Sequence, residues 1–145
     1  SRRIQIMAKN GFSMSNRVAV EEVTAGSTKT LTVDDCGKFF YIAQGTSATT
    51  LNLPSLSDAE NGWNITVAKT VSGSSSAAIL IGASADDGAS PMQGVRLSPS
   101  GAVLAGDDLQ IAAVADAGTR VTLTKAGTAW VILGMCAADA DIVIG

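Results

Sequence analysis

This chain of 145 residues has the length of a single domain. Apolar residues make up 46% of it and charged residues only 16%, against about 25% charged in a typical soluble domain. The sequence contains no histidine, which excludes Ser-His-Asp and Cys-His catalytic centres and most zinc sites. So low a charge indicates a surface covered either by partners or by neutral polar residues, and the composition fits both readings.

The charges are divided unevenly along the chain. Residues 1–17 contain four bases and no acid, whereas residues 18–145 contain six bases and thirteen acids. We therefore predict an extended basic arm, residues 1–17, on an acidic body. Four bases are a weak nucleic-acid signal and the acidic body repels phosphate. We expect the arm to contact an acidic protein surface and not nucleic acid.

The first half of the chain alternates apolar and polar residues in short runs, which is typical of half-buried strands. The turn Asp34-Asp35-Cys36-Gly37-Lys38 separates two of these runs, and Pro54 ends another. Strands are predicted at residues 17–23, 30–33, 39–42, 49–53 and 63–67.

The second half begins with an almost continuous apolar run, 77–81, which predicts a central strand buried on both faces. The long loop 82–94 is the best candidate for a contact loop, with Pro91 and Met92 near its tip. Asp116-Ala117-Gly118 predicts a hairpin turn and Lys125-Ala126-Gly127 another turn. Further strands are predicted at 95–97, 102–104, 109–113, 121–124 and 130–133, with 142–144 as a short strand or a partner-seeking tail.

Roughly ten short strands at intervals of about 8–12 residues, with no helical period, predict an all-β fold. We expect an antiparallel β-sandwich of jelly-roll type. Its parts would be the arm 1–17, the sandwich 18–136 and a C-terminal tail or short strand 137–145. No run reaches 18 apolar residues, so no transmembrane helix and no membrane contact are predicted.

Chemistry could only rest on three acidic pairs, Asp34-Asp35, Asp86-Asp87 and Asp107-Asp108. Adjacent residues on a strand point to opposite faces, so no single pair forms a catalytic dyad. Turn formation is the favoured interpretation, and a Ca²⁺ site shared between loops is the alternative. We predict no enzyme, no catalytic residue, no metal and no cofactor.

The cysteines and aromatic residues have structural interpretations. Two cysteines a hundred positions apart, Cys36 and Cys136, form neither a disulfide scaffold nor a metal motif, so reduced thiols are expected. The aromatic residues are interpreted mainly as core, although an exposed edge of Phe39 and Tyr41 would suit a protein interface. The aromatic residues considered are Phe39, Phe40, Tyr41, Trp63 and Trp130.

Several short motifs resemble a module of bacteriophage virion proteins. They are Leu31-Thr32-Val33-Asp34-Asp35-Cys36-Gly37-Lys38 with its following strand 39–42, Leu51-Asn52-Leu53-Pro54-Ser55-Leu56, and Gly62-Trp63-Asn64-Ile65. The stretch from Gly106-Asp107-Asp108-Leu109 to Thr128-Ala129-Trp130-Val131 resembles the closing hairpin of that module, with Ala129 where the pattern often has Asn.

Such modules occur in tail-fibre proteins and in capsid-surface proteins. The short chain, without a stalk repeat and with a basic arm, resembles the small capsid decoration or cement proteins. That resemblance implies a non-enzymatic homo-dimer or homo-trimer made in the bacterial host cytoplasm, bound to the major capsid protein on the virion surface. The expected contact residues are Arg2, Arg3, Ile4, Ile6, Lys9, Phe12 and Arg17 of the arm, and Pro91 and Met92 of the loop.

Two other functions stay open at this point. One is a receptor- or glycan-binding head of a tail fibre, which solvent-exposed Trp63, Tyr41 or Trp130 would favour. The other is a secreted carbohydrate-active enzyme that uses Asp86 or Asp107.

Overall fold

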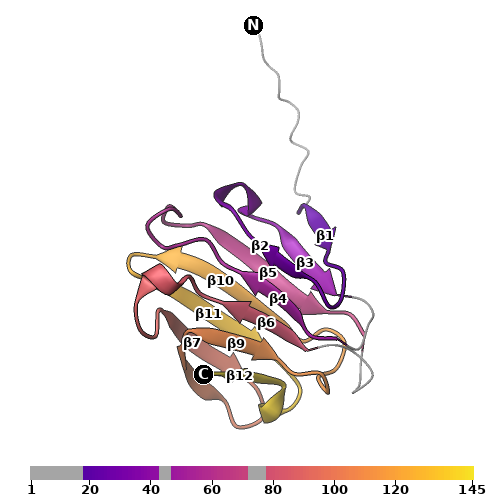
Figure 1. Cartoon of the computed structure of the whole chain (residues 1–145). Coiled ribbons are helices and arrows are strands. Elements are labelled where there is room, and N and C mark those ends of the chain that lie inside the picture. The colour runs from indigo at the N-terminus through magenta and orange to yellow at the C-terminus, as the bar shows by residue number, and fades with distance from the viewer. Residues whose placement is uncertain (1–17, 43–46, 72–77) are drawn as a thin grey trace, which may run out of the picture.

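The computed structural model describes residues 18–42, 47–71 and 78–145, and it is built almost entirely of β-strands. Two sheets pack face to face around one core (Figure 1). The prediction of an all-β sandwich is therefore confirmed. The arm predicted at 1–17 lies outside the described residues.

The larger sheet has seven strands in the order β1-β3-β5-β10-β11-β7-β8, and the smaller has five in the order β12-β9-β6-β4-β2. The strands of the larger sheet are β1 (Val20–Glu22), β3 (Phe39–Ile42), β5 (Asn64–Lys69), β10 (Arg120–Ala126), β11 (Ala129–Met135), β7 (Met92–Leu97) and β8 (Ala102–Gly106). Those of the smaller sheet are β12 (Ile142–Ile144), β9 (Asp108–Ile111), β6 (Ile79–Gly82), β4 (Thr49–Asn52) and β2 (Thr28–Thr30). Three short 3₁₀ turns are η2 (Val33–Asp35), η3 (Ala85–Asp87) and η4 (Asp139–Asp141).

From β1 to β6 the chain passes from one sheet to the other at every step, so each turn of the chain adds one strand to each sheet. Successive turns stack with parallel pairing, β1–β3–β5 in one sheet and β2–β4–β6 in the other. β9 and β10 then pair antiparallel with β6 and β5 and end this winding. The sheets are thus mixed and not purely antiparallel, because residue alternation reports which face is buried but not which way the neighbouring strand runs.

The core lies between the sheets and takes alternate residues of central strands such as β3, β4, β6 and β9. Phe40 and Ile42 on β3 face inward, as do Ile79 and Ile81 on β6, and all four are at most 3% exposed. Leu80 on β6 is half-buried on the outer face, so this central strand is fully buried on one face only.

The predicted strand 30–33 is wrong in its boundaries, because a capping box replaces its second half. β2 ends at Thr30, and the 3₁₀ turn η2 begins at Val33. The backbone N–H of Thr32 donates to Asp35 Oδ2 at 2.9 Å, while Thr32 Oγ1 accepts from the Asp34 N–H at 3.3 Å. Local side-chain hydrogen bonds therefore outweigh the alternating pattern here.

Two other connections differ in type. Asp116-Ala117-Gly118 does not close a hairpin, since β9 and β10 belong to different sheets. The Gly118 N–H donates instead to the Lys69 carbonyl at 2.7 Å. The turn at Gly127 does close a hairpin, because β10 and β11 pair directly from Arg120–Met135 to Ala126–Ala129.

The C-terminal segment is part of the fold and not a free tail. β12 pairs antiparallel with β9, and Ile142 is fully buried. Of the two alternatives predicted for 137–145, a tail or a short strand, the structure shows the short strand at Ile142–Ile144.

Candidate functional site

The contact residues predicted on the long loop are buried. Pro91 lies in the interior and Met92 is 0% exposed at the start of β7, where it pairs with Trp130 of β11. The loop is also shorter than predicted, because η3 and β7 take up much of it. Neither side chain is available for surface contact, so this prediction is wrong. The other predicted contact residues, Arg2, Arg3, Ile4, Ile6, Lys9, Phe12 and Arg17, lie outside the described residues.

The two tryptophans belong to the core. Their rings meet edge to face, with centroids 5.4 Å apart and planes at 70°. Trp63 is 4% exposed and donates from Nε1 to the Val33 carbonyl at 3.0 Å. Trp130 is fully buried and donates from Nε1 to Asp87 Oδ2 at 3.3 Å. Neither indole offers a face on which a sugar could stack.

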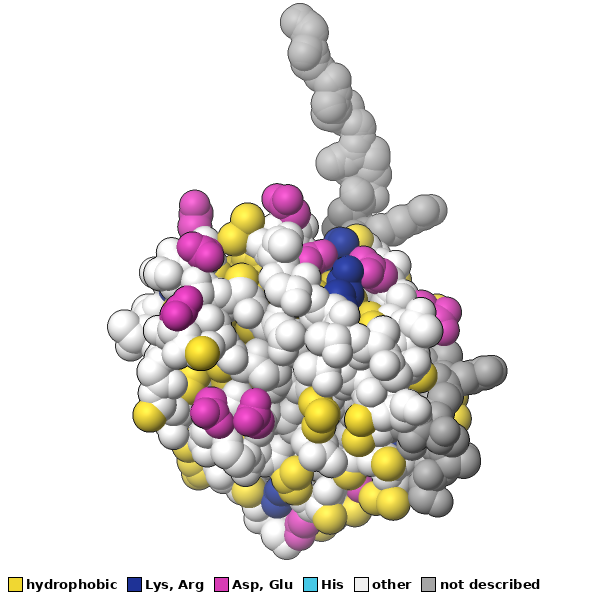
Figure 2. All heavy atoms as spheres, viewed as in Figure 1, with side chains coloured by type: hydrophobic (Ala, Val, Ile, Leu, Met, Phe, Trp, Pro, Cys, Tyr) yellow, Lys and Arg dark blue, Asp and Glu magenta, His cyan; other side chains and the backbone are white. Residues whose placement is uncertain are grey.

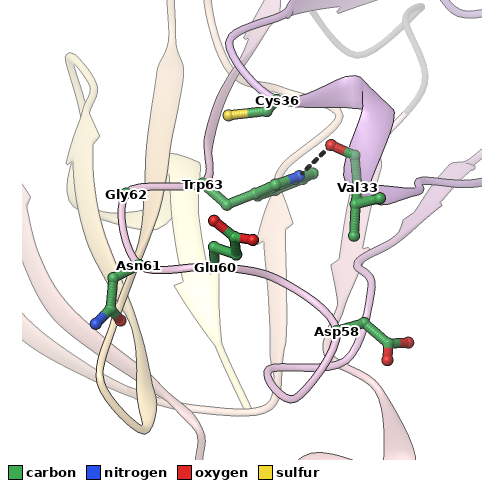
Figure 3. Close-up of a pocket in the computed structure, with 7 residues that line it drawn as sticks. All are labelled: Val33, Cys36, Asp58, Glu60, Asn61, Gly62 and Trp63. Atoms are coloured by element: carbon green, nitrogen blue, oxygen red, sulfur yellow. Dashed lines mark hydrogen bonds between the residues drawn. The ribbon is translucent and has the colours of Figure 1, made fainter.

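A surface hollow of about 420 Å³ lies beside Trp63 (Figure 3). The Trp63 ring lies between Cys36 and Glu60, whereas the side chains of Asn61 and Asp58 point away from it. The thiol of Cys36 and the carboxylate of Glu60 therefore lie on opposite sides of the indole ring. It is lined by Val33, Cys36, Asp58, Glu60, Asn61, Gly62 and Trp63.

The acidic pairs serve the turns, as predicted. Asp35 and Asp87 hold backbone and indole N–H groups, and Asp107 lies between β8 and β9. Among the described residues, no group of three or more acidic or cysteine side chains is placed to hold a metal ion. Cys36 and Cys136 are both free thiols, and burial raises the pKa of Cys136.

Charged side chains gather at the start of the winding. Lys38 Nζ lies 2.9 Å from Asp35 Oδ1 and 3.1 Å from Glu21 Oε1, and Lys29 Nζ lies 3.1 Å from Glu21 Oε2. Hydrogen bonds from Lys38 and Lys29 lower the pKa of Glu21. Burial acts to raise the pKa of Asp35, but hydrogen bonds from Thr32 and Lys38 hold it below its usual range. This network ties β1, β2 and β3 together and leaves no group poised for catalysis.

One lysine is buried in the body. Lys69, at the end of β5, is 1% exposed and donates from Nζ to the carbonyls of Ala112 and Ala113. Burial lowers the pKa of its ammonium group, against the attraction of Asp141 and Asp116. Its contacts join β5 to the turn after β9, which is a structural role.

The outer face of the larger sheet carries the one large apolar surface among the described residues. Six of the eleven exposed large hydrophobic side chains lie on three adjacent strands, so they form one patch and are not scattered. We call this the apolar face. It consists of Val95 and Leu97 on β7, Val103 on β8, and Val131, Leu133 and Met135 on β11.

Register brings these side chains side by side. Val103 pairs with Val95, Val95 pairs with Leu133, and the row continues into Thr122 of β10 and Thr66 of β5. The outward positions of β7, β8 and β11 carry no charged residue. The row is thus aliphatic on β8, β7 and β11 and becomes polar, with threonine, on β10 and β5. An uncharged aliphatic patch with a polar border is typical of a binding surface.

The opposite side of the molecule is different. The face shown in Figure 2 is mostly neutral and polar, with isolated hydrophobic atoms and with acidic side chains in small groups. Low charge is therefore achieved in two ways, by neutral polar residues on one side and by aliphatic residues on the apolar face. The neutral polar surface agrees with one of the two interpretations of the composition, and coverage by partners stays a prediction.

A scan against protein-family models and a search of curated proteins both find no match for this chain. No helix in the described part of the chain is long and apolar enough to cross a membrane. The geometry of the described residues therefore defines the candidate site. Of the features described, the apolar face is the one that the packing of this chain does not explain.

Proposed function

We propose that this chain is a structural protein of a bacteriophage virion, which binds the outer capsid surface and cements neighbouring coat subunits. The observation that carries the proposal is the apolar face, an uncharged aliphatic surface on three adjacent strands. The short motifs shared with virion modules supply the kind of partner, the major capsid protein.

Binding would work by burial of apolar surface. The patch is three strands wide, at about 4.8 Å per strand, and five residues long, at about 3.4 Å per residue. Its projected area is therefore on the order of 250 Å². Apolar area removed from water stabilises a complex by about 25 cal/mol per Å². One patch gives modest affinity, and many copies on a capsid add their contributions to resistance against internal pressure.

The receptor- or glycan-binding fibre head is the weaker alternative. Stacking on a sugar needs an exposed aromatic face, and both tryptophans are at most 4% exposed. Tyr41 is half-buried and its hydroxyl lies 3.4 Å from Glu22. The glycosidase hypothesis has still less support. Asp86 and Asp58 line one open surface hollow of about 600 Å³, but no contact assigns either carboxylate an acid or a nucleophile role. Asp107 belongs to the turn between β8 and β9.

The test is co-sedimentation of the purified protein with capsids assembled without it. We expect saturable binding at a fixed copy number per coat protein. Leu133→Lys places a charge in the middle of the apolar face and should abolish binding. Thr66→Lys places the same charge in the same row on the polar part of the same sheet, and should bind like the wild type.

Deletion of residues 1–17 tests the proposed arm and should weaken binding without unfolding the body. No binding by a folded wild-type protein would overturn the proposal and favour host-surface ligands. Equal binding by Leu133→Lys and Thr66→Lys would exclude the apolar face as the contact.

A further inference from the structure

The two sheets end in four edge strands. Two of them, β1 and β2, carry charged residues, and on a third, β12, one backbone group of the edge is already hydrogen-bonded within the chain. β1 and β2 carry Glu21 and Lys29, which form an ion pair at 3.1 Å. Charged residues on an edge strand oppose further pairing. On β12, the outward carbonyl of Ile142 accepts a hydrogen bond of 2.9 Å from Arg96 Nη1.

β8 is the edge without such protection. Its five residues, Ala102–Gly106, include no charged residue, no proline and no bulge in the ladder with β7. Val103 is 83% exposed, the highest value among the exposed large hydrophobic residues. Natural edge strands of this kind are usually covered by something.

The hydrogen-bond pattern shows which backbone groups of β8 are open. The N–H groups of Trp130 on β11 and of Cys136, the residue that follows β11, donate to the carbonyls of Pro91 and Leu97. Odd-numbered residues of β7 therefore face β11, and even-numbered ones face β8. Because Gly94 pairs with Leu104, the even-numbered residues of β8 point to β7. The N–H and C=O groups of Val103 and Ala105 consequently point away from the sheet.

We propose that β8 of a second copy of this chain pairs antiparallel with β8 about a two-fold axis at Leu104, so that Val103 of each copy faces Ala105 of the other. In this register each Val103–Ala105 pair exchanges two backbone hydrogen bonds, which satisfies all four open groups on each copy. An isologous contact of this kind closes at two copies and does not propagate into a fibre.

The charges agree with this register. The N–H groups of the two acids that follow β8, Asp107 and Asp108, already donate to the Gly145 carbonyl at 3.0 and 3.2 Å, so the paired ladder ends before them. At that end of the ladder these acids would lie nearest Gly101 and Ser100 of the second copy. Acidic side chains thus meet small neutral residues and not one another, which matters in a body that carries thirteen acids and six bases. Pairing shifted by one residue would leave outward groups unmatched, because both copies must present odd-numbered residues to each other.

The pairing also explains the size of the apolar face. Two three-strand patches would join through β8 into one surface of six strands, on the order of 500 Å² in projection. With the relief of its side chains, this approaches the roughly 800 Å² that each partner contributes to a standard protein interface. The inference concerns the strand edge and holds or fails independently of the proposed function.

The first experiment measures the mass of the full chain by size-exclusion chromatography with light scattering. We expect twice the monomer mass of 14.6 kDa. Ala105→Pro removes one outward N–H and should give a monomer, because proline is tolerated on an edge strand but cannot donate to a partner. Ala105→Ser keeps the N–H and should remain dimeric, and circular dichroism checks that both variants are folded.

The second experiment tests the register without depending on the proline variant. A hydrogen-bonded antiparallel pair has Cα atoms about 5.5 Å apart, which is within the range of a disulfide. In a Cys36→Ser background, a mixture of Val103→Cys and Ala105→Cys chains should cross-link under oxidised glutathione. Each variant alone should not, because the like residues lie two positions out of register.

Three results would overturn the inference. They are a wild-type monomer or trimer, a dimeric Ala105→Pro variant, or equal cross-linking by the single variants and the mixture. A wild-type monomer that dimerises only after removal of residues 1–17 would also overturn it, since the edge would then belong to the chain's own N-terminal segment.

Discussion

Removal of the Asp87 carboxylate should destabilise the fold by about 2–3 kcal/mol. Asp87 Oδ1 accepts the Leu56 N–H at 2.8 Å, and Oδ2 accepts the Trp130 indole N–H at 3.3 Å. Asp87→Ala leaves both donors without their acceptor, and each unsatisfied buried group costs about 1–3 kcal/mol. Asp87 is half-buried, so water can partly replace the carboxylate and the lower part of the summed range applies.

The assay is equilibrium unfolding in urea, followed by the fluorescence of Trp63 and Trp130 and by circular dichroism. Asp87→Asn keeps one carbonyl acceptor and should lose about half as much stability. Asp86→Ala removes the exposed neighbouring carboxylate and should change the free energy of unfolding by less than about 0.5 kcal/mol. If Asp87→Ala were as stable as Asp86→Ala, the two hydrogen bonds would not stabilise the fold and the reasoning would be refuted.

Three further predictions concern the fold and its dependence on pH. In Gly94→Ala the new methyl group would meet the backbone of Ile132, so the free energy of unfolding, measured by thermal unfolding, should fall by about 3 kcal/mol or more. In the control Gly145→Ala the methyl group meets open space, and the free energy of unfolding should not change. The folded-state pKa of Asp35 is lowered, so its stabilising contribution is present above about pH 4 and is lost as the pH falls through the folded pKa. In Asp35→Asn the free energy of unfolding, measured in urea at acidic pH, should therefore fall less steeply with decreasing pH than in the wild type. An unchanged slope would contradict this. The folded-state pKa of Lys69 is also lowered, so wild-type stability should rise relative to Lys69→Met as the pH increases toward about 10.4, and a difference that stays constant between pH 7 and pH 10 would exclude the burial effect.

Residue alternation predicted a strand correctly where one face of the strand is buried and the other is exposed. A strand was predicted at 39–42 with Phe40 as a core residue, and both Phe40 and Ile42 lie in the core. The rule failed at Val33, where a threonine and an aspartate three residues apart form a capping box. The two residues of the capping box are present in the sequence, but Leu31 and Val33 alternate with polar residues over the same stretch and so predict a strand there.

Strand direction and sheet membership could not be read from the sequence. Asp116-Ala117-Gly118 has the composition of a hairpin turn, yet it carries the chain between sheets because β9 already has neighbours on both sides. Met92 was placed in a loop because glycines surround it, although its pairing with Trp130 buries it completely. Both outcomes depend on contacts between residues distant in the sequence, which a local pattern does not contain.

The apolar face did leave a signal in the sequence. Residues 130–133 are apolar without interruption, and an uninterrupted apolar strand is typical of burial on both faces. In the described structure β11 is covered on one face only, by the core, while Val131 and Leu133 remain 47% and 41% exposed. On β7 the sequence is not continuously apolar, yet Val95 and Leu97 also point outward and are exposed.

An open apolar face and an open strand edge each cost free energy when a single chain is exposed to water, and here they share one strand. β8 forms the border of the apolar face and holds the unpaired groups of Val103 and Ala105. Pairing of the edge alone would enlarge the exposed apolar surface and so increase the drive to bind a third surface. Binding of the face alone would leave the edge open beside the bound partner. In the arrangement we propose, two copies of the chain pair through β8 and lay their joined apolar faces on one partner, which would satisfy both features together.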